Sequence, residues 1–238
     1  MAPRGILFDK DGTLLDYHET WMPANRAVAH ALSGGDAALA LHLLTIGGWD
    51  AETDRVGSGT PLAAGDLQDI AVLWHPYLPA GDTRSVDDIV AFLDTGFPDN
   101  MVPTAVCDLG PLLDELAGQL GLCLGVATAD SVNGLNRSLE PFGILDRFRF
   151  AAGFDSGHGR KPEPGMVHAF CALCGVQPGE VIVVGDNRHD IDMARAAGAR
   201  AVGVLTGTSD AGQLMDAGAE AVLASISRLP EYCRDARI

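Results

Sequence analysis

Short apolar runs alternate with amphipathic segments over most of this chain. The apolar runs have the length and residue types of buried strands, and helical periodicity fills the segments between them. The expected strands lie at residues 5–8, 122–128, 149–152, 181–184, 201–204 and 221–223, and the expected helices near residues 110–120, 131–142, 163–174, 190–197 and 209–217. This alternation predicts an α/β fold with a Rossmann-like, doubly wound parallel sheet.

The pattern changes between residues 16 and 103. Alanine- and leucine-rich helical periodicity dominates there, and no segment has a convincing strand pattern. We therefore predict a helical domain inserted early in the chain, with a hinge near Asp16 and at residues 96–103. The predicted core consists of residues 1–16 and 104–238, and the predicted α-helical cap domain of residues 17–103.

Composition agrees with this organisation and restricts the partners. With 238 residues and 47% hydrophobic content, the chain can bury a full α/β core and carry a second small domain. The formal net charge of −16 disfavours nucleic acid and anionic membranes, because both attract clusters of basic residues. No signal-like segment precedes Ile6 and no apolar run reaches transmembrane length, so we expect a cytoplasmic protein. Its oligomeric state, monomer or homodimer, is left open.

The chain has five cysteines, namely Cys107, Cys123, Cys171, Cys174 and Cys233. An odd number without an export signal predicts reduced thiols. Cys171 and Cys174 have the spacing of a redox or zinc motif. However, no second pair exists for zinc, and the pair ends an expected helix, where the helix dipole does not activate a thiolate. We expect this pair to pack in the core.

The sequence DKDGT at residues 9–13 follows the first apolar run. Asp9 and Asp11 stand two residues apart, so in extended backbone both side chains point to one face, and Gly12 permits the turn that folds Asp11 back over Asp9. One carboxylate can then attack while the other moves protons. Taken alone, the motif also fits a metal-binding loop or an acidic turn. Lys10 is expected to point to the opposite face, in a packing or surface role.

Three later segments place polar side chains after apolar runs: Thr128, Lys161, and the pair Asp186 and Asp190. Because the carboxyl ends of parallel strands meet in one crevice, we expect these groups to share a site with the first motif. Such a concentration of carboxylates needs the lysine and a hard divalent cation, for which Mg²⁺ is the natural choice. Read singly, the acids also fit helix caps, the lysine a surface residue and the threonine an ordinary strand end.

With four motifs in order over essentially the whole chain, the sequence resembles the haloacid dehalogenase superfamily, in the branch of the phosphoglycolate phosphatases. The resemblance implies that Asp9 is a nucleophile that forms an aspartyl-phosphate, and that Asp11 protonates the leaving alcohol and then activates water. It also implies that Asp186 and Asp190 bind or support Mg²⁺ together with the Asp9 carboxylate and the Asp11 backbone carbonyl. The implied substrate is a small phosphate ester, with phosphoglycolate as the leading candidate.

The phosphate-binding residues that this resemblance implies are Gly12, Thr128, Ala129 and Lys161. Thr128 would hold a phosphate oxygen, and Lys161 would bridge the nucleophile and the phosphate. The chain departs from many relatives, which carry Asn after the motif threonine. Here Ala129 and Asp130 follow instead, and we expect Asp130 to cap the next helix and His189 to be a solvated loop residue.

Other functions differ in identifiable features. A β-phosphoglucomutase-like phosphosugar mutase would keep every core motif, so only the cap and the lifetime of the phosphoenzyme separate it from a phosphatase. Dehalogenases and phosphonatases of this fold lack the second acid, so Asp11 speaks against both. A phospho-receiver is much shorter and accepts phosphate on a later strand. A binding scaffold would not need every charged group of the mechanism.

The cap is expected to close over the crevice, exclude water and read the leaving alcohol. Guanidinium groups suit a second anion, and aromatic rings suit the walls of such a site. The candidate residues are Arg26, Arg55, Arg84, His18, Trp49 and Trp74. Each also fits an ordinary surface arginine or core residue, so none is assigned.

Overall fold

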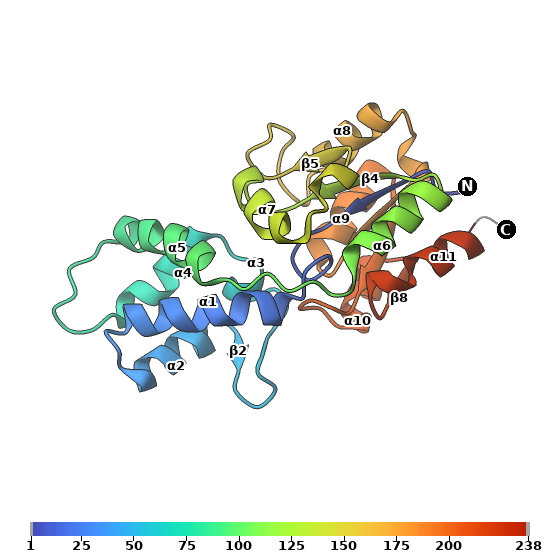
Figure 1. Cartoon of the computed structure of the whole chain (residues 1–238). Coiled ribbons are helices and arrows are strands. Elements are labelled where there is room, and N and C mark those ends of the chain that lie inside the picture. Colours follow the sequence, from blue (N-terminus) through green and yellow to red (C-terminus); the bar gives the residue numbers. More distant parts are fainter. Residues whose placement is uncertain (1, 237–238) are drawn as a thin grey trace. The chain divides into compact units, whose positions relative to one another are not determined.

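The chain divides into two compact units in the computed structural model, which describes residues 2–236 (Figure 1). Unit 1 consists of Met1–Tyr17 and Pro103–Ile238, and unit 2 of His18–Val102. Unit 1 therefore contains both ends of the sequence, whereas unit 2 is one continuous segment. Each unit is described separately.

Unit 1 is built on a six-stranded sheet in the order β5-β4-β1-β6-β7-β8. The strands are β1 (Gly5–Phe8), β4 (Cys123–Ala127), β5 (Phe150–Ala152), β6 (Val181–Gly185), β7 (Arg200–Val204) and β8 (Ala221–Leu223). All neighbouring strands are parallel. The strand order runs outward in both directions from β1, which lies between β4 and β6. The predicted doubly wound α/β fold is confirmed.

Helices cover both faces of this sheet. On one face lie α6 (Leu109–Asp114), the π-helical turn η2 (Glu115–Gln119), α7 (Val132–Leu139) and α11 (Leu229–Asp235). On the other lie α8 (Gly165–Cys174), α9 (Arg188–Ala197) and α10 (Ala211–Ala217). Short 3-10 turns occupy Glu140–Phe142, Leu145–Arg147, Pro178–Glu180 and Ile226–Arg228. The final helix α11 is absent from the sequence prediction.

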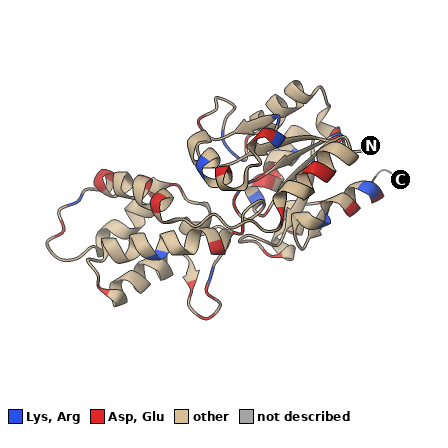
Figure 2. Ribbon diagram, viewed as in Figure 1, with Lys and Arg blue, Asp and Glu red and all other residues tan. Residues whose placement is uncertain are grey.

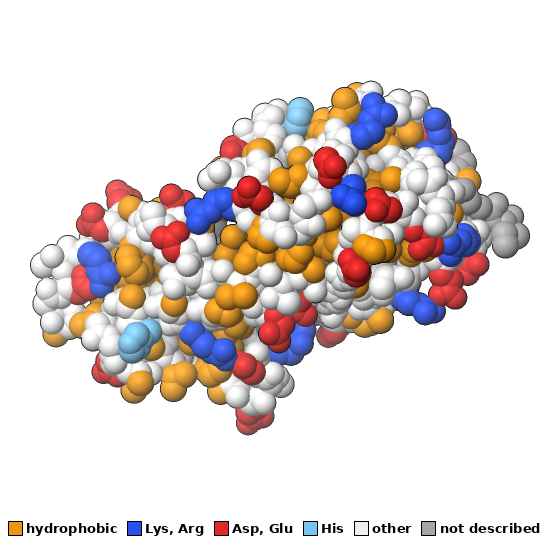
Figure 3. Space-filling model, in the orientation of Figure 1, with side chains coloured by type: hydrophobic (Ala, Val, Ile, Leu, Met, Phe, Trp, Pro, Cys, Tyr) orange, Lys and Arg blue, Asp and Glu red, His pale blue; other side chains and the backbone are white. Residues whose placement is uncertain are grey.

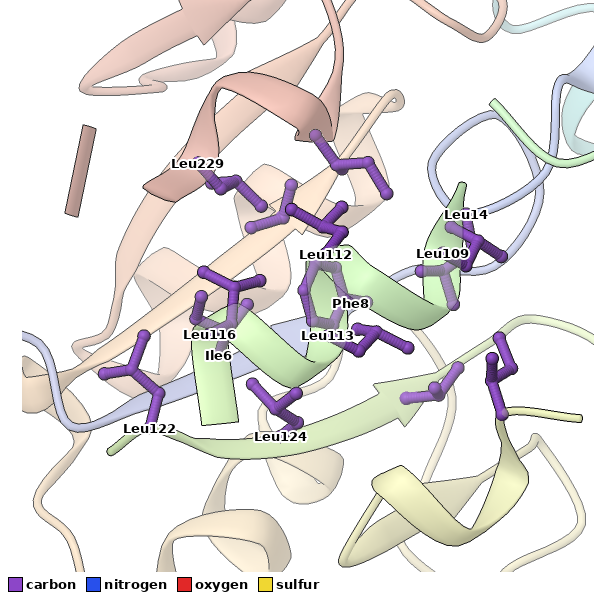
Figure 4. Close-up of a cluster of buried hydrophobic side chains, with 14 of the residues drawn as sticks. Ile6, Phe8, Leu14, Leu109, Leu112, Leu113, Leu116, Leu122, Leu124 and Leu229 are labelled. Atoms are coloured by element: carbon purple, nitrogen blue, oxygen red, sulfur yellow. The ribbon is translucent and has the colours of Figure 1, made fainter. Parts of the chain in front are cut away.

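β1 shows why the sheet needs cover on both sides. All four of its residues are buried, as expected for a central parallel strand. Ile6 and Phe8 belong to the cluster beneath α6, whereas Leu7 belongs to the cluster beneath α8. Figure 4 shows the first cluster, in which leucines of α6 and η2 lie over Ile6 and Phe8. The period-two alternation thus supplies a core to each face.

Unit 2 is mostly helical. Its helices are α1 (Tyr17–Leu32, which begins in unit 1), α2 (Ala37–Ile46), α3 (Pro61–Ala64), α4 (Leu67–Trp74), the 3-10 turn η1 (His75–Tyr77) and α5 (Val86–Asn100). Two expectations for this segment are wrong. β2 (Trp49–Asp50) and β3 (Arg55–Val56) form a small antiparallel hairpin, although no strand was expected. The helix α5 continues through residues 96–100, which were expected to belong to a connection.

The cysteines also differ from expectation. Cys123, at the start of β4, is joined to Cys174, at the end of α8, by a disulfide with a Cα separation of 6.2 Å. The expectation of reduced thiols is therefore wrong for these two residues. Cys171 and Cys233 are buried as free thiols, and Cys107 is partly exposed. Cys171 packs in the cluster beneath α8, as expected.

Acidic residues are distributed along both units (Figure 2). On the face drawn in Figure 3, acidic and basic side chains are interspersed with apolar ones rather than gathered by sign. Among residues 2–236, none of the helices is long and apolar enough to cross a bilayer.

Candidate active site

Three buried carboxylates meet beyond the carboxyl ends of β1 and β6. Asp9 directly follows β1, and Asp186 and Asp190 follow β6. One oxygen from each lies within 4.8 Å of the others. Because β1 and β6 are neighbours in the sheet, their carboxyl ends deliver these acids to one place, as the sequence predicted.

Lys161 lies in the same cluster. Its Nζ donates to Asp9 Oδ1 at 2.5 Å and to Asp190 Oδ1 at 2.6 Å, and only 4% of its side chain is exposed. Burial alone would lower the pKa of Lys161, but the Asp190 and Asp9 carboxylates outweigh burial and raise it above its ordinary value. Lys161 is therefore a permanent cation between two acids, and not the solvated surface lysine that a single Lys suggests.

One lysine does not balance three carboxylates. Burial raises the pKa of Asp9 to about 6, although Lys161 opposes the shift. Burial also raises the pKa of Asp186 well above its usual range, and the Asp9 and Asp190 charges add to that effect. Burial and the mutual repulsion of the carboxylates therefore outweigh the single positive charge of Lys161. Clustered carboxylate oxygens are also the ligands that hard divalent cations prefer, so the donor set fits a metal ion.

Glycines make room for these carboxylates. A Cβ on Gly12, whose φ is +82°, would lie 2.5 Å from Asp186 Cγ, and a Cβ on Gly207 would lie 1.9 Å from Asp186 Oδ2. A Cβ on Gly185 would lie 2.2 Å from Asp190 Cγ. Since real Cβ atoms do not approach this closely, glycine is required at these three positions if both acids are to keep their places.

Asp190 serves the helix and the cluster at once. Its Oδ2 accepts from the Asn187 backbone N–H at 3.1 Å, which completes a capping box at the start of α9, while its Oδ1 accepts from Lys161. Helix capping and site formation, which the sequence left as alternatives, are both present. The capping bond fixes the carboxylate through the backbone of the helix.

The loop after β7 supports the cluster and was missed from the sequence. The Thr208 backbone N–H donates to Asp186 Oδ2 at 2.8 Å, and its hydroxyl lies 3.3 Å from the same oxygen. The Thr206 hydroxyl donates to the Gly12 carbonyl at 2.6 Å. The loops after β1 and β6, which carry the acids, are thereby hydrogen-bonded to the loop after β7. A Thr-Gly-Thr sequence after a strand was the available signal, but it also fits an ordinary turn.

Lys10 and Asp130 do not lie where the sequence suggested. Lys10 is fully buried, and its Nζ lies 2.9 Å from Asp11 Oδ2 and 3.0 Å from Asp130 Oδ2. A surface position for Lys10 is therefore wrong, and so is the expectation that its side chain points away from Asp11. Asp130 does not cap α7 either, because Ser131 does so by accepting from the Gly134 backbone N–H.

Opposing effects act on the pKa of Asp11. Burial raises its pKa, and Asp130 and Asp9 act in the same direction, whereas the charge of Lys10 lowers it. The net shift is upward. Lys10 itself has a raised pKa: burial would lower it, but Asp11 and Asp130 together prevail. A carboxyl with a raised pKa next to a carboxylate of low exposure is the arrangement that acid–base chemistry at neutral pH uses.

The remaining predicted residues lie on the same edge of the sheet or next to it. Thr128 follows β4, is 1% exposed, and accepts from the Asp130 backbone N–H through Oγ1 at 3.1 Å. Ala129 is exposed. His189 is exposed as well, but it lies in the first turn of α9 rather than in a loop.

Five candidate residues of the cap have a hydrogen-bond or ion-pair partner within unit 2. Trp74 is fully buried and its indole N–H donates to the Leu43 carbonyl at 2.8 Å, so it belongs to the core of that unit. Asp54 accepts from both Arg26 and Trp49. Arg84 pairs with Asp82, and His18 Nε2 accepts from the Val56 backbone N–H.

The family profile of the haloacid dehalogenase-like hydrolases matches residues 3–198, and the chain belongs to this family of hydrolases. Phosphoglycolate phosphatases from Pectobacterium atrosepticum and Escherichia coli are each 28% identical to it, over 87% and 86% of this chain and 82% of their own lengths. The predicted resemblance is therefore confirmed.

Solved structures show the same fold. A Lactobacillus delbrueckii protein assigned as a phosphoglycolate phosphatase superimposes with a TM-score of 0.72 at 21% identity, covering 98% of this chain and 99% of its own. A Thermotoga maritima protein assigned as a β-phosphoglucomutase gives a TM-score of 0.69 at 18% identity, with 98% and 99% coverage. The fold is common to hydrolases and mutases, so it does not choose between them.

Proposed function

We propose that this hydrolase is a Mg²⁺-dependent phosphatase that cleaves a small phosphomonoester through an aspartyl-phosphate on Asp9. The observation that carries the proposal is the contact of Lys161 with Asp9 inside a cluster of three buried acids. An isolated buried carboxylate would hold its proton, whereas an ion-paired one is available as a nucleophile. The 28% identity to phosphoglycolate phosphatases supports the substrate class.

In this proposal Asp9 attacks phosphorus and the alcohol leaves with a proton from Asp11. Asp11 then accepts a proton from the water that hydrolyses the phosphoenzyme. The raised pKa of Asp11 suits both steps, because the carboxyl must give up and regain its proton near neutral pH. Lys161 stabilises the negative charge that the phosphoryl group brings, and Thr128 and the Gly12 and Ala129 positions hold phosphate oxygens.

The residues that would hold the metal ion are the carboxylates of Asp9, Asp186 and Asp190, together with the backbone carbonyl of Asp11. A bound Mg²⁺ would neutralise the phosphoryl oxygens and orient the ester toward Asp9. Oxygen donors and the charge balance of the site favour Mg²⁺ over softer metals.

Unit 2 is proposed to act as the cap that reads the leaving alcohol, with phosphoglycolate as the leading candidate substrate. A β-phosphoglucomutase-like mutase is the alternative, since it would use the same acids and lysine. A cytoplasmic location and a monomeric or homodimeric state also stay predictions.

The experiment is a panel assay of the purified full chain with Mg²⁺. Phosphoglycolate, other small phosphate esters and hexose phosphates are supplied separately, and both free phosphate and isomerised sugar are measured. Release of phosphate from a small ester supports the proposal. Interconversion of hexose 1- and 6-phosphates with little free phosphate establishes the mutase instead. If no compound of the panel reacts, both the phosphatase and the mutase proposals are contradicted.

A further inference from the structure

Lys10 forms a buried ionic centre beside the site. Its Nζ has three acceptors within about one hydrogen-bond length, namely Asp11 Oδ2 at 2.9 Å, Asp130 Oδ2 at 3.0 Å and Ser138 Oγ at 3.1 Å. An ammonium group has three protons to donate, so these acceptors match its capacity. The Lys10 side chain is 0% exposed, whereas its two acidic partners are 22% and 30% exposed.

The composition of the chain sets Lys10 apart. The sequence has 16 Lys and Arg residues, and all of them are arginine except Lys10 and Lys161. Both lysines are buried and each joins two carboxylates. Arginine therefore supplies every other basic position, and lysine occurs at the two positions where a compact point charge must fit between acids. A planar guanidinium does not replace an ammonium in such a place.

Lys10 also joins two loops of different strands. Asp11 belongs to the loop after β1, and Asp130 to the loop after β4. The Asp130 backbone N–H donates to Thr128 Oγ1 at 3.1 Å. A change in the position of Lys10 is thus transmitted to the carboxyl of Asp11 on one side and to the segment that carries Thr128 on the other.

We infer that Lys10 is a positioning residue for the proton-transfer step, which holds the Asp11 carboxyl toward the leaving alcohol by fixing its Oδ2. This inference rests on the proposed phosphatase function. Lys10 itself need not touch substrate. Because the bond fixes one carboxyl oxygen, it limits rotation about the Asp11 side chain and sets the place of the other oxygen. General acid catalysis depends on that geometry before it depends on acidity.

The test uses two esters that differ in how much they need a proton. An alkyl phosphate releases a strongly basic alkoxide, so its cleavage requires the general acid. The nitrophenolate of p-nitrophenyl phosphate is a stable anion and leaves unprotonated. The parameter to compare is kcat/KM, which covers only the steps up to phosphoenzyme formation and so excludes the later attack of water.

The Lys10→Met substitution should lower kcat/KM for the alkyl ester about 10- to 100-fold more than kcat/KM for the aryl ester. This difference is smaller than the full contribution of a general acid, because Asp11 itself is still present. Ser138→Ala is the matched control, because it removes the neutral acceptor of Lys10 and leaves both ion pairs. Its alkyl-to-aryl ratio should equal that of the wild type.

Loss of Lys10 removes the buried cation that lies between Asp11 and Asp130, and the repulsion between the two carboxylates then lowers the stability of the fold. The double variant Lys10→Met/Asp130→Asn removes one of these charges, and its thermal unfolding is compared with the wild type. The lowered alkyl-to-aryl ratio of kcat/KM should persist in the folded double variant. An equal loss for both esters, or none, in the folded variants overturns the inference. Wild-type turnover of either ester tests the phosphatase proposal by itself.

Discussion

Lys161 Nζ lies 2.5 Å from Asp9 Oδ1, so the proposed nucleophile is in direct contact with a buried cation. The contact fixes which oxygen of Asp9 is paired with the lysine. It also means that Asp9 cannot lose its charge without leaving Lys161 short of a partner. Substitutions at Asp9 are therefore expected to affect both chemistry and charge balance.

Asp9→Asn should abolish turnover, because an amide is a poor nucleophile and the metal cluster loses one charged ligand. Steady-state phosphate release is the measurement. Asp114→Asn is the isosteric control, since Asp114 is exposed and pairs with Arg147 on the surface, and it should leave activity unchanged. Activity of Asp9→Asn above about one hundredth of wild type would refute the nucleophile assignment, since covalent catalysis cannot proceed without that group.

Asp11→Asn should slow turnover by about 10²- to 10⁴-fold, the usual contribution of a general acid and base. Metal affinity should change little, because the proposed ligand at this position is the backbone carbonyl. Turnover and Mg²⁺ titration are measured on the same preparation. If Mg²⁺ binding disappears without a separate chemical defect, the side chain is a ligand and the acid–base role is wrong.

Removal of the metal should inactivate the enzyme reversibly. After EDTA treatment and dialysis, activity should return with Mg²⁺ but not with Ca²⁺, which prefers more ligands at longer distances. Asp186→Ala should raise the Mg²⁺ requirement most, and Asp190→Ala should have a weaker or comparable effect. Full activity of the dialysed protein in EDTA would contradict the metal-dependent mechanism.

Gly207→Ala should raise the Mg²⁺ concentration needed for half-maximal activity, because the new methyl group would overlap Asp186 Oδ2. Gly118→Ala is the matched control, since a Cβ at Gly118 has no atom within 4 Å. It should leave the metal requirement as in the wild type. Equal Mg²⁺ titration curves for the two variants would show that Asp186 tolerates the overlap.

Phe170→Ala should destabilise unit 1 by about 3–5 kcal/mol, the cost of removing a large ring from a packed core. Phe170 is fully buried, and its ring lies against Phe150 at a centroid distance of 5.9 Å. Leu173→Ala, on the same helix but 50% exposed, should change stability by less than about 0.5 kcal/mol. Urea unfolding measures both, and similar midpoints would contradict the packing argument.

The sheet could be predicted because each of its strands is a short apolar run between polar segments. Within the site, Asp9, Lys161, Asp186 and Asp190 were expected to meet, and they do. Their catalytic roles stay predictions. The hairpin of β2 and β3 could not be predicted, because strands of two residues are too short to show an alternation of apolar and polar residues.

The position of the Lys10 side chain could not be predicted from the strand pattern. Strand alternation would direct it away from Asp9 and Asp11, but β1 ends at Phe8 and the loop beyond it has no period of two. Its contacts depend on Asp130, which comes from another strand end. The Cys123–Cys174 bond likewise depends on the approach of β4 and α8, and a count of cysteines carries no information on that approach.

The central position of β1 has a consequence for synthesis of the chain. Gly5–Phe8 leaves the ribosome before its partners β4 and β6, which come from the middle and the last third of the given sequence. The apolar strand must therefore wait unpaired while unit 2, which is continuous, is made in full. Pairing over such sequence distances is slow and exposes apolar surface. A nascent chain truncated before β6 would lack Asp186 and Asp190 and one side of its central strand at the same time.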